Sequence, residues 1–115
     1  MYYFEFIIIS YPTPSSLSFW SLACKTANAT AKHRFLIDYE EYVEGVCQQA
    51  EDREAGRIRS ISDYMDLRRR AGACKPAFDL LLLPLELPNH ILDHPIIAEL
   101  TILSMDMISL ANVRV

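Results

Sequence analysis

The sequence contains little glycine and cysteine, and each shortage excludes a class of protein. Three glycines and six prolines among 115 residues, with 51% hydrophobic residues, exclude collagen-like and generally disordered chains. The three cysteines, Cys24, Cys47 and Cys74, form no C-x-x-C pair, which argues against a disulfide framework and against a zinc module. We therefore expect a reducing compartment, the cytoplasm.

Basic residues and long apolar runs are also scarce. Eleven lysines and arginines against fifteen acidic residues give a net charge of −4, so we expect no nucleic-acid partner. The apolar run at residues 6–9 is far shorter than the ~20 residues that span a bilayer, so we expect no membrane partner. No Lys or Arg precedes this run, which leaves a weak secretion signal as the less favoured alternative to a strand-like or disordered tail. A chain of this length forms one domain at most.

Apolar residues that recur at steps of three and four predict an all-α fold with about four helices. The first predicted helix covers residues 19–54, with a break near Asn28. The second begins at a capping serine, Ser60 or Ser62, and runs to about Ala71.

Two further helices are predicted downstream. The third, residues 77–83, is almost entirely apolar, which is typical of a buried helix, and a strand is its alternative. The fourth begins after a cap at Asp93 or His94, with Pro95 at its first helical position. Its apolar side chains are expected to point inward: Ile96, Ile97, Leu100, Leu103, Met107, Ile108 and Leu110.

Three successive arginines, Arg68, Arg69 and Arg70, close the second predicted helix. Because helical neighbours lie ~100° apart, no more than two of them point the same way, so one or two face a cavity. The arginine fork suits phosphate because it forms two parallel charge-assisted hydrogen bonds. The alternative is a solvated helix C-terminus, where cations complement the helix dipole.

The fourth predicted helix carries Asp106 and Asn112 among apolar residues. An amide near the end of such a helix is either an oxygen ligand for a hard cation or a simple C-cap. The acidic runs at residues 38–41 and 51–52 are expected to lie on solvent-exposed faces. No Gly-rich phosphate loop, G-x-S-x-G or H-E-x-x-H motif is present.

Several segments together resemble, in order and spacing, the class I terpene synthases, particularly the fungal sesquiterpene cyclases. These segments are Arg34-Phe35, residues 42–46 (YVEGV), 49–53 (QAEDR), 60–69 (SISDYMDLRR), 75–78 (KPAF), Leu87-Pro88, His94-Pro95 and 106–112 (DMISLAN). The resemblance covers about residues 19–112. It implies a partial helical bundle of the isoprenoid synthase type, built around an apolar pocket.

The resemblance also implies a chemistry. In that family a magnesium cluster draws the diphosphate off farnesyl diphosphate or a related prenyl diphosphate, and the resulting carbocation cyclises. By resemblance, Arg69 is the diphosphate sensor, and Gly72 and Ala73 form the helix break whose carbonyl faces the cation. The family usually has glycine at position 73. Asn112 resembles the first residue of a magnesium-binding motif, so we expect Arg69 and Asn112 to face a common hollow.

The sequence departs from the family pattern in two places. The aspartate, serine and glutamate of the second metal motif do not follow Asn112, and the aspartate-rich first motif is absent. We therefore expect residues 19–112 to be a fragment of a terpene synthase domain. Residues 1–18 and 113–115 are then atypical ends encoded by intron sequence in a gene model. We assign no catalytic residue and expect no activity of the isolated chain; the alternative is a small non-catalytic helical interaction protein.

Overall fold

The computed structural model describes residues 14–112, and every regular element in this range is a helix, which confirms the all-α prediction. The elements are α2 (Pro14–Thr26), α3 (Ala29–Glu54), α4 (Ile61–Ala71), α5 (Cys74–Leu82), the 3-10 helix η1 (Leu83–Leu85), α6 (Asn89–Leu92) and α7 (Pro95–Ala111). Because α2 begins at Pro14, residues 14–18 of the predicted tail are helical. The predictions for residues 1–13 and 113–115 lie outside the described residues. In the described part of the chain, no helix combines the length and apolar character needed to cross a membrane.

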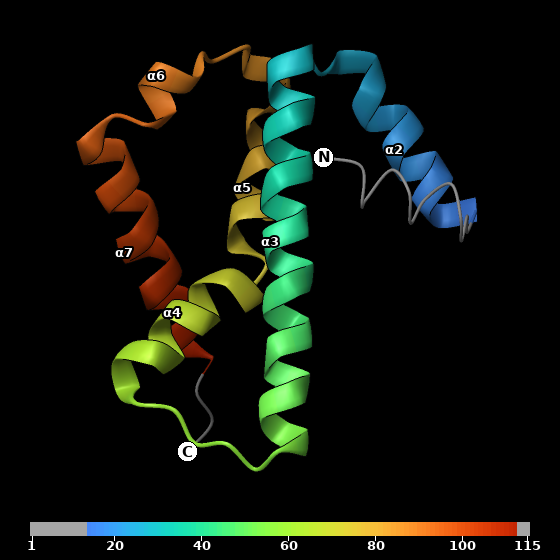
Figure 1. The fold of residues 1–115 in the computed structure, drawn as a ribbon. Coiled ribbons are helices and arrows are strands. Elements are labelled where there is room, and N and C mark those ends of the chain that lie inside the picture. The colour runs from blue at the N-terminus through green and yellow to red at the C-terminus, as the bar shows by residue number, and fades with distance from the viewer. Residues whose placement is uncertain (1–13, 113–115) are drawn as a thin grey trace.

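The helices form an open frame (Figure 1). The long helix α3 runs beside α5 on one side, and α7 forms the other side. Near one end α4 packs on both α3 and α7, and α6 lies at the other end, where the chain passes from η1 to α7. This arrangement places α3, α5 and α7 around a central space.

Side-chain caps explain where three helices begin. The Oδ1 of Asn28 accepts a 2.8 Å hydrogen bond from the backbone N–H of Ala31 and so caps α3. Ser60 caps α4 in the same way, through a hydroxyl that accepts a backbone N–H in the first turn. His94 caps α7 through its Nδ1, and Pro95 follows at the first helical position. The starts at Ser60 and His94 are among those predicted, and the break predicted near Asn28 lies where α3 begins.

Helix α5 begins earlier than predicted, at Cys74, and contains Pro76 in its first turn. Proline is tolerated there because the first backbone N–H groups of a helix have no partner within it. Leu80 and Leu81 of α5 are exposed. The prediction of a helix buried all round is therefore wrong.

The buried side of α7 is also not the predicted one. Met105 is 2% exposed and Ser109 is 6% exposed, so these two side chains form the buried stripe. Among the described residues, α4 and α6 provide the main contacts with α7, which leaves most of its surface open. The apolar side chains that were predicted to point inward are exposed: Ile96, Ile97, Leu100, Leu103, Met107, Ile108 and Leu110.

Helices α3 and α4 come very close to one another at Gly45, which is buried. A Cβ atom on Gly45 would lie 2.9 Å from the backbone N of Ala71 and 3.0 Å from the Cβ of Arg70. Because one of these atoms belongs to the α4 backbone, a side chain at position 45 would force the two helices apart.

We predict that Gly45→Ala lowers the free energy of unfolding by about 1–3 kcal/mol, because overpacking outweighs the better helix propensity of alanine. Urea unfolding followed by circular dichroism measures the change. The matched control is Ala50→Gly at an exposed position of α3, which reports helix propensity alone. A Gly45→Ala variant as stable as the unmodified chain would contradict the close approach of the two helices.

Candidate functional site

Arg69, near the end of α4, reaches across to α7 and forms a bidentate ion pair with Asp106. Its Nε and Nη2 atoms donate hydrogen bonds of 2.7 and 2.8 Å to the two carboxylate oxygens of Asp106. Its Nη1 donates a 2.8 Å hydrogen bond to Oδ1 of Asp66. The hydrogen bonds from Arg69 hold the pKa of Asp106 below its ordinary value. The guanidinium fork of Arg69 is therefore already engaged by two carboxylates.

The other two arginines of the run do not fit the alternative prediction of a solvated helix C-terminus either. Arg68 and Arg70 are half-buried, as Arg69 is, so the end of α4 is not a fully solvated terminus. The Cβ of Arg70 lies against Gly45 at the contact between α3 and α4. Of the three arginines, Arg69 is the one whose side chain joins α4 to α7.

The chain turns between α4 and α5 at Gly72 and Ala73. Gly72 has a right-handed backbone with φ −84°, whereas Ala73 has a left-handed one with φ 58° and ψ 17°. A left-handed backbone costs an alanine about 1–2 kcal/mol, and glycine avoids that cost. Ala73, the residue with the left-handed backbone at this break, thus stands at the position where the resembled family usually has glycine.

Asn112 is the C-cap of α7, and its backbone N–H donates a 3.1 Å hydrogen bond to the carbonyl of Ile108. Its side chain is exposed. Within residues 14–112, no group of three or more His, Cys, Asp or Glu side chains is placed to hold a metal ion. Since one amide oxygen is a single ligand and Mg²⁺ takes near-octahedral oxygen coordination, the described residues alone do not fit a magnesium site.

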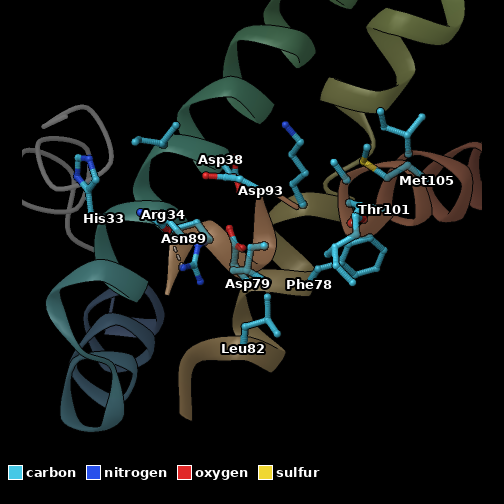
Figure 2. A pocket seen from close by; sticks show the side chains of 16 residues that line it. His33, Arg34, Asp38, Phe78, Asp79, Leu82, Asn89, Asp93, Thr101 and Met105 are labelled. Carbon is cyan, nitrogen blue, oxygen red and sulfur yellow. Dashed lines mark hydrogen bonds between the residues drawn. The ribbon is translucent and has the colours of Figure 1, made fainter. Parts of the chain in front are cut away.

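A cavity of about 420 Å³ lies between α3, α5 and α7 (Figure 2). Most of its wall is apolar and includes Ile37, Phe78, Leu82, Ile97, Ile102 and Met105. Neither Arg69 nor Asn112 belongs to its lining. The prediction that these two residues face a common hollow is therefore not met by this cavity.

Arg69 and Asn112 are nevertheless both connected to α7, the helix that forms one wall of the cavity. Thr101 and Met105 line the cavity from one face of this helix. Asn112 follows Met105 by seven residues, or about two helical turns, so it continues the same face beyond the cavity. Asp106, the partner of Arg69, is the neighbour of Met105. Arg69 and Asn112 thus lie toward the same end of α7.

Two carboxyl groups meet in the cavity wall, one from α3 and one from α5. Asp79 is 5% exposed and lies beside Asp38, and among the described residues no hydrogen-bond donor reaches its Oδ2. Burial, and then the hydrogen bond and charge of Asp38, raise the pKa of Asp79 to about 8, although Arg34 and Lys75 act in the opposite direction. The pair therefore holds a proton at neutral pH.

The two cations near this pair have partners elsewhere. Arg34 donates hydrogen bonds from Nη2 to the carbonyl of Leu87 at 3.1 Å and to Oδ1 of Asn89 at 2.7 Å. Lys75 donates a 3.2 Å hydrogen bond to Oε2 of Glu41. Arg34 thus fastens the segment before α7 to α3, and Lys75 fastens α5 to α3.

Residues 15–112 match the family model described as terpene synthase family 2, C-terminal metal binding. The chain belongs to this family. The resemblance inferred from the segments above is therefore confirmed. No solved structure matches the chain.

Curated relatives of this terpene synthase chain come from basidiomycete fungi. A protein of Armillaria gallica named Delta(6)-protoilludene synthase is 42% identical over 97 residues, which is 84% of this chain and 28% of the relative. Its namesake in Armillaria ostoyae is 44% identical over 94 residues, 82% of this chain and 28% of the relative. Sesquiterpene synthase 9 of Postia placenta is 37% identical over 94 residues, 82% of this chain and 27% of the relative. The chain thus spans little more than a quarter of the length of these terpene synthases.

Sequence reasoning missed two groups of charged residues in this terpene synthase chain. Asp79 is the only charged residue in the apolar segment 77–83, and a lone acid in such a segment was the available signal. Asp52, expected on a solvent-exposed face, is 7% exposed and pairs with Arg57 and Arg59. Hydrogen bonds from Arg59 contribute most to holding the pKa of Asp52 below its ordinary value. These pairs anchor the loop between α3 and α4.

We predict that the Asp79 carboxyl group makes the free energy of unfolding fall as the pH rises from about 4 to about 8. The pKa of Asp79 is about 8 in the folded chain against an ordinary 3.8, so the folded state binds more protons in this window. The stabilisation is complete below the unfolded pKa and is lost as the pH rises through the folded pKa.

Because an amide does not titrate, Asp79→Asn should flatten this slope in urea unfolding curves recorded between about pH 5 and pH 9. Glu99→Gln removes an exposed carboxylate of α7 and is the matched control, which should keep the slope. Parallel pH dependences of the unmodified chain and Asp79→Asn would contradict the assignment.

Proposed function

We propose that this chain is a segment of a sesquiterpene synthase that acts on a prenyl diphosphate, specifically farnesyl diphosphate. The observation that carries the proposal is the 42% identity, over 84% of the chain, to a protein named Delta(6)-protoilludene synthase. The name of the Postia placenta relative, Sesquiterpene synthase 9, supports the same substrate class. The activity is proposed for a protein that includes this segment, since the segment covers 28% of the Armillaria gallica relative.

The geometry suits the two halves of such a substrate. A cavity of about 420 Å³ with mainly apolar walls falls within the usual range for small-molecule pockets and would take the hydrocarbon chain. Arg69, joined to α7 next to the cavity residue Met105, would take the diphosphate. We further propose that the carbonyl at the break formed by Gly72 and Ala73 faces the hydrocarbon chain.

Arg69 would have to change partners to bind a diphosphate. With Asp66 and Asp106 attached, the guanidinium belongs to a group of net charge −1, which repels a further anion. A diphosphate oxygen would replace a carboxylate oxygen on the same planar fork, because both present paired acceptor oxygens. Asp106 thus competes with the diphosphate for Arg69.

We propose Mg²⁺ as the metal of the intact enzyme, with Asn112 as one ligand. The family description includes metal binding, and an amide oxygen is a suitable ligand for a hard cation. A magnesium ion bound there would supply positive charge for the leaving diphosphate. The described residues of this chain do not complete that site, so no step is assigned to it.

We also propose a cytoplasmic location for the protein. The three cysteines, Cys24, Cys47 and Cys74, are free thiols, which supports a reducing compartment, the cytoplasm. The exposed apolar side chains of α7 are compatible with a small helical interaction protein. Membership of the terpene synthase family over residues 15–112 gives the synthase proposal the stronger support.

We predict that Arg69 is the pyrophosphate-binding residue of the chain and that Asp106 weakens this binding. Asp106→Asn keeps the shape but removes the competing charge, and should raise the affinity for inorganic pyrophosphate about tenfold, the effect of one charge-assisted hydrogen bond. Arg69→Gln should lower it by at least a similar factor. Isothermal titration calorimetry at low salt measures both effects. The control is Glu99→Gln, which removes an exposed charge outside this group. A pyrophosphate affinity that Arg69→Gln leaves unchanged would contradict the assignment.

We predict no cyclase turnover by the 115-residue chain with farnesyl diphosphate and Mg²⁺, because its described residues cannot compensate the charge of a leaving diphosphate. Gas chromatography of extracts, compared with a boiled sample, checks this expectation. Terpene product above the boiled control would contradict it.

A chimera tests the proposed function itself. Residues 15–112 replace the matched segment of the Armillaria gallica relative, and the chimera should form a sesquiterpene. Arg69→Gln in the chimera should reduce product formation at least about a hundredfold, whereas Glu99→Gln should leave it unchanged. A chimera with native helix content that forms no terpene would refute the proposed function.

A further inference from the structure

A second pocket, of about 300 Å³, lies where the end of α3 and the loop after it meet α4 (Figure 1). Three arginines and one acid belong to its lining, which gives the lining a net charge of +2. These charged residues are Asp52, Arg53, Arg57 and Arg59. The pocket is therefore positively charged in a chain whose net charge is −4.

The acid in this pocket positions two of the arginines. The Oδ1 of Asp52 accepts hydrogen bonds from Nη1 of Arg57 at 3.3 Å and from Nη2 of Arg59 at 3.0 Å, and its Oδ2 accepts one from Nε of Arg59. The amide of Gln48 also donates to Oδ1, at 3.2 Å. Because a guanidinium carries five N–H groups, Arg57 and Arg59 both keep donors that Asp52 does not use.

Arg53 supplies a third guanidinium. Its side chain is exposed and, within residues 14–112, forms no ion pair and no side-chain hydrogen bond. The pocket thus combines surplus positive charge with more hydrogen-bond donors than acceptors. A phosphate group meets both conditions, because it is anionic and its oxygens accept the paired hydrogen bonds of an arginine fork.

The α4 side of the pocket is less polar. Leu67 is buried, and Tyr64 contributes an exposed ring to the same lining. A volume of about 300 Å³ is at the lower end of the range for small-molecule sites and exceeds what a phosphate group alone would fill. A phosphate ester with a flat apolar group would use the arginines for its phosphate and the ring of Tyr64 for the rest.

This pocket is separate from the proposed diphosphate site. Leu67 and Arg69 are two residues apart in α4, which places them about 200° apart around the helix axis. Leu67 therefore lines the pocket on one side of α4, while Arg69 meets Asp106 of α7 on the other.

We propose that the pocket between α3 and α4 binds a soluble phosphate monoester with a flat apolar group, through Arg53, Arg57 and Arg59. The proposal goes beyond the proposed function and does not rest on it. It rests on the charge of the lining, the unused donors held in place by Asp52 and the unpaired Arg53.

A lipid headgroup offers the same phosphate chemistry, and Ile58 and Ile61 beside the pocket are exposed. However, the exposed acids Glu51, Glu54 and Asp63 lie in the same stretch of the chain. An anionic membrane would face these acids as well as the arginines, whereas a small ester contacts the arginines alone. The charges therefore favour the soluble ester.

The test is a titration of the full 115-residue chain with phenyl phosphate, followed by NMR signals of the backbone amides and of the arginine Nε–H groups. We expect saturable shifts at residues 55–60 and at the three pocket arginines. Arg53→Gln should lower the affinity at least about threefold without disturbing the fold, since Arg53 has no partner among the described residues to lose. The double variant Arg53→Gln/Arg57→Gln should lower it at least about tenfold.

Three controls separate the parts of the proposal. Lys25→Gln removes an exposed cation of α2 and should leave the affinity within about twofold. Inorganic phosphate should shift the same signals with lower affinity, and neutral benzyl alcohol should bind more weakly and ignore Arg53→Gln. Phosphatidylcholine vesicles that contain phosphatidic acid should sediment no more of the chain than vesicles without it.

Three results would overturn the proposal. One is equal affinity of the unmodified chain and the double variant for phenyl phosphate. Another is a set of shifts confined to the surroundings of Arg69. The third is binding to phosphatidic acid vesicles without binding of the soluble ester.

The chimera provides a second measurement that does not depend on the stability of the isolated chain. Isothermal titration calorimetry of the chimera with phenyl phosphate should show the same loss of affinity in the double variant, whether or not the chimera forms a terpene. An affinity that the double variant leaves unchanged in the chimera would overturn the proposal as well.

Discussion

The ion pair between Arg69 and Asp106 is the interaction on which the open frame depends. Helix α7 buries little of its apolar surface, with Met105 and Ser109 as its buried side chains, so hydrophobic packing alone holds it weakly. The bidentate pair fixes α7 against α4 at one end, and the hydrogen bonds of Arg34 fix the segment before α7 at the other. The cavity lies where α7 is held at these two polar contacts and makes few contacts with α3 and α5.

Under the proposed function, Arg69 would serve both structure and recognition. Arg69 donates to Asp106 in the described state, and a diphosphate would need the same donors. Binding of an anion at this fork would therefore weaken the contact that positions α7, the helix that carries Asn112. A ligand that binds Arg69 more tightly when Asp106 is released shifts the equilibrium between the paired and the released state of Arg69. The free energy of this shift equals the difference between the ligand's binding free energies for the two states, and no more.

Local signals in the sequence identified the long helices but not the start of α5, the short helix α6 or the packing of the helices. The caps at Ser60 and His94 act within a few residues, so they could be predicted from the sequence, whereas near Asn28 only a break was predicted. The buried side of α7 depends on which helices lie against it, and periodicity cannot tell this when apolar residues surround the whole helix. The pair of Asp38 and Asp79 likewise joins two helices distant in sequence, and no local pattern reports such a contact.

The two charged features are separated in the fold, because the carboxyl pair lines the cavity and Arg69 lies outside its lining. The carboxyl pair belongs to the early part of α3 and to α5, whereas Arg69 meets α7 beside Met105, toward the end that leads to Asn112. An anion is attracted to a guanidinium and repelled by carboxylates, and a cation shows the opposite preference. Under the proposed function, the diphosphate would therefore lie toward Arg69 and the hydrocarbon chain in the apolar cavity.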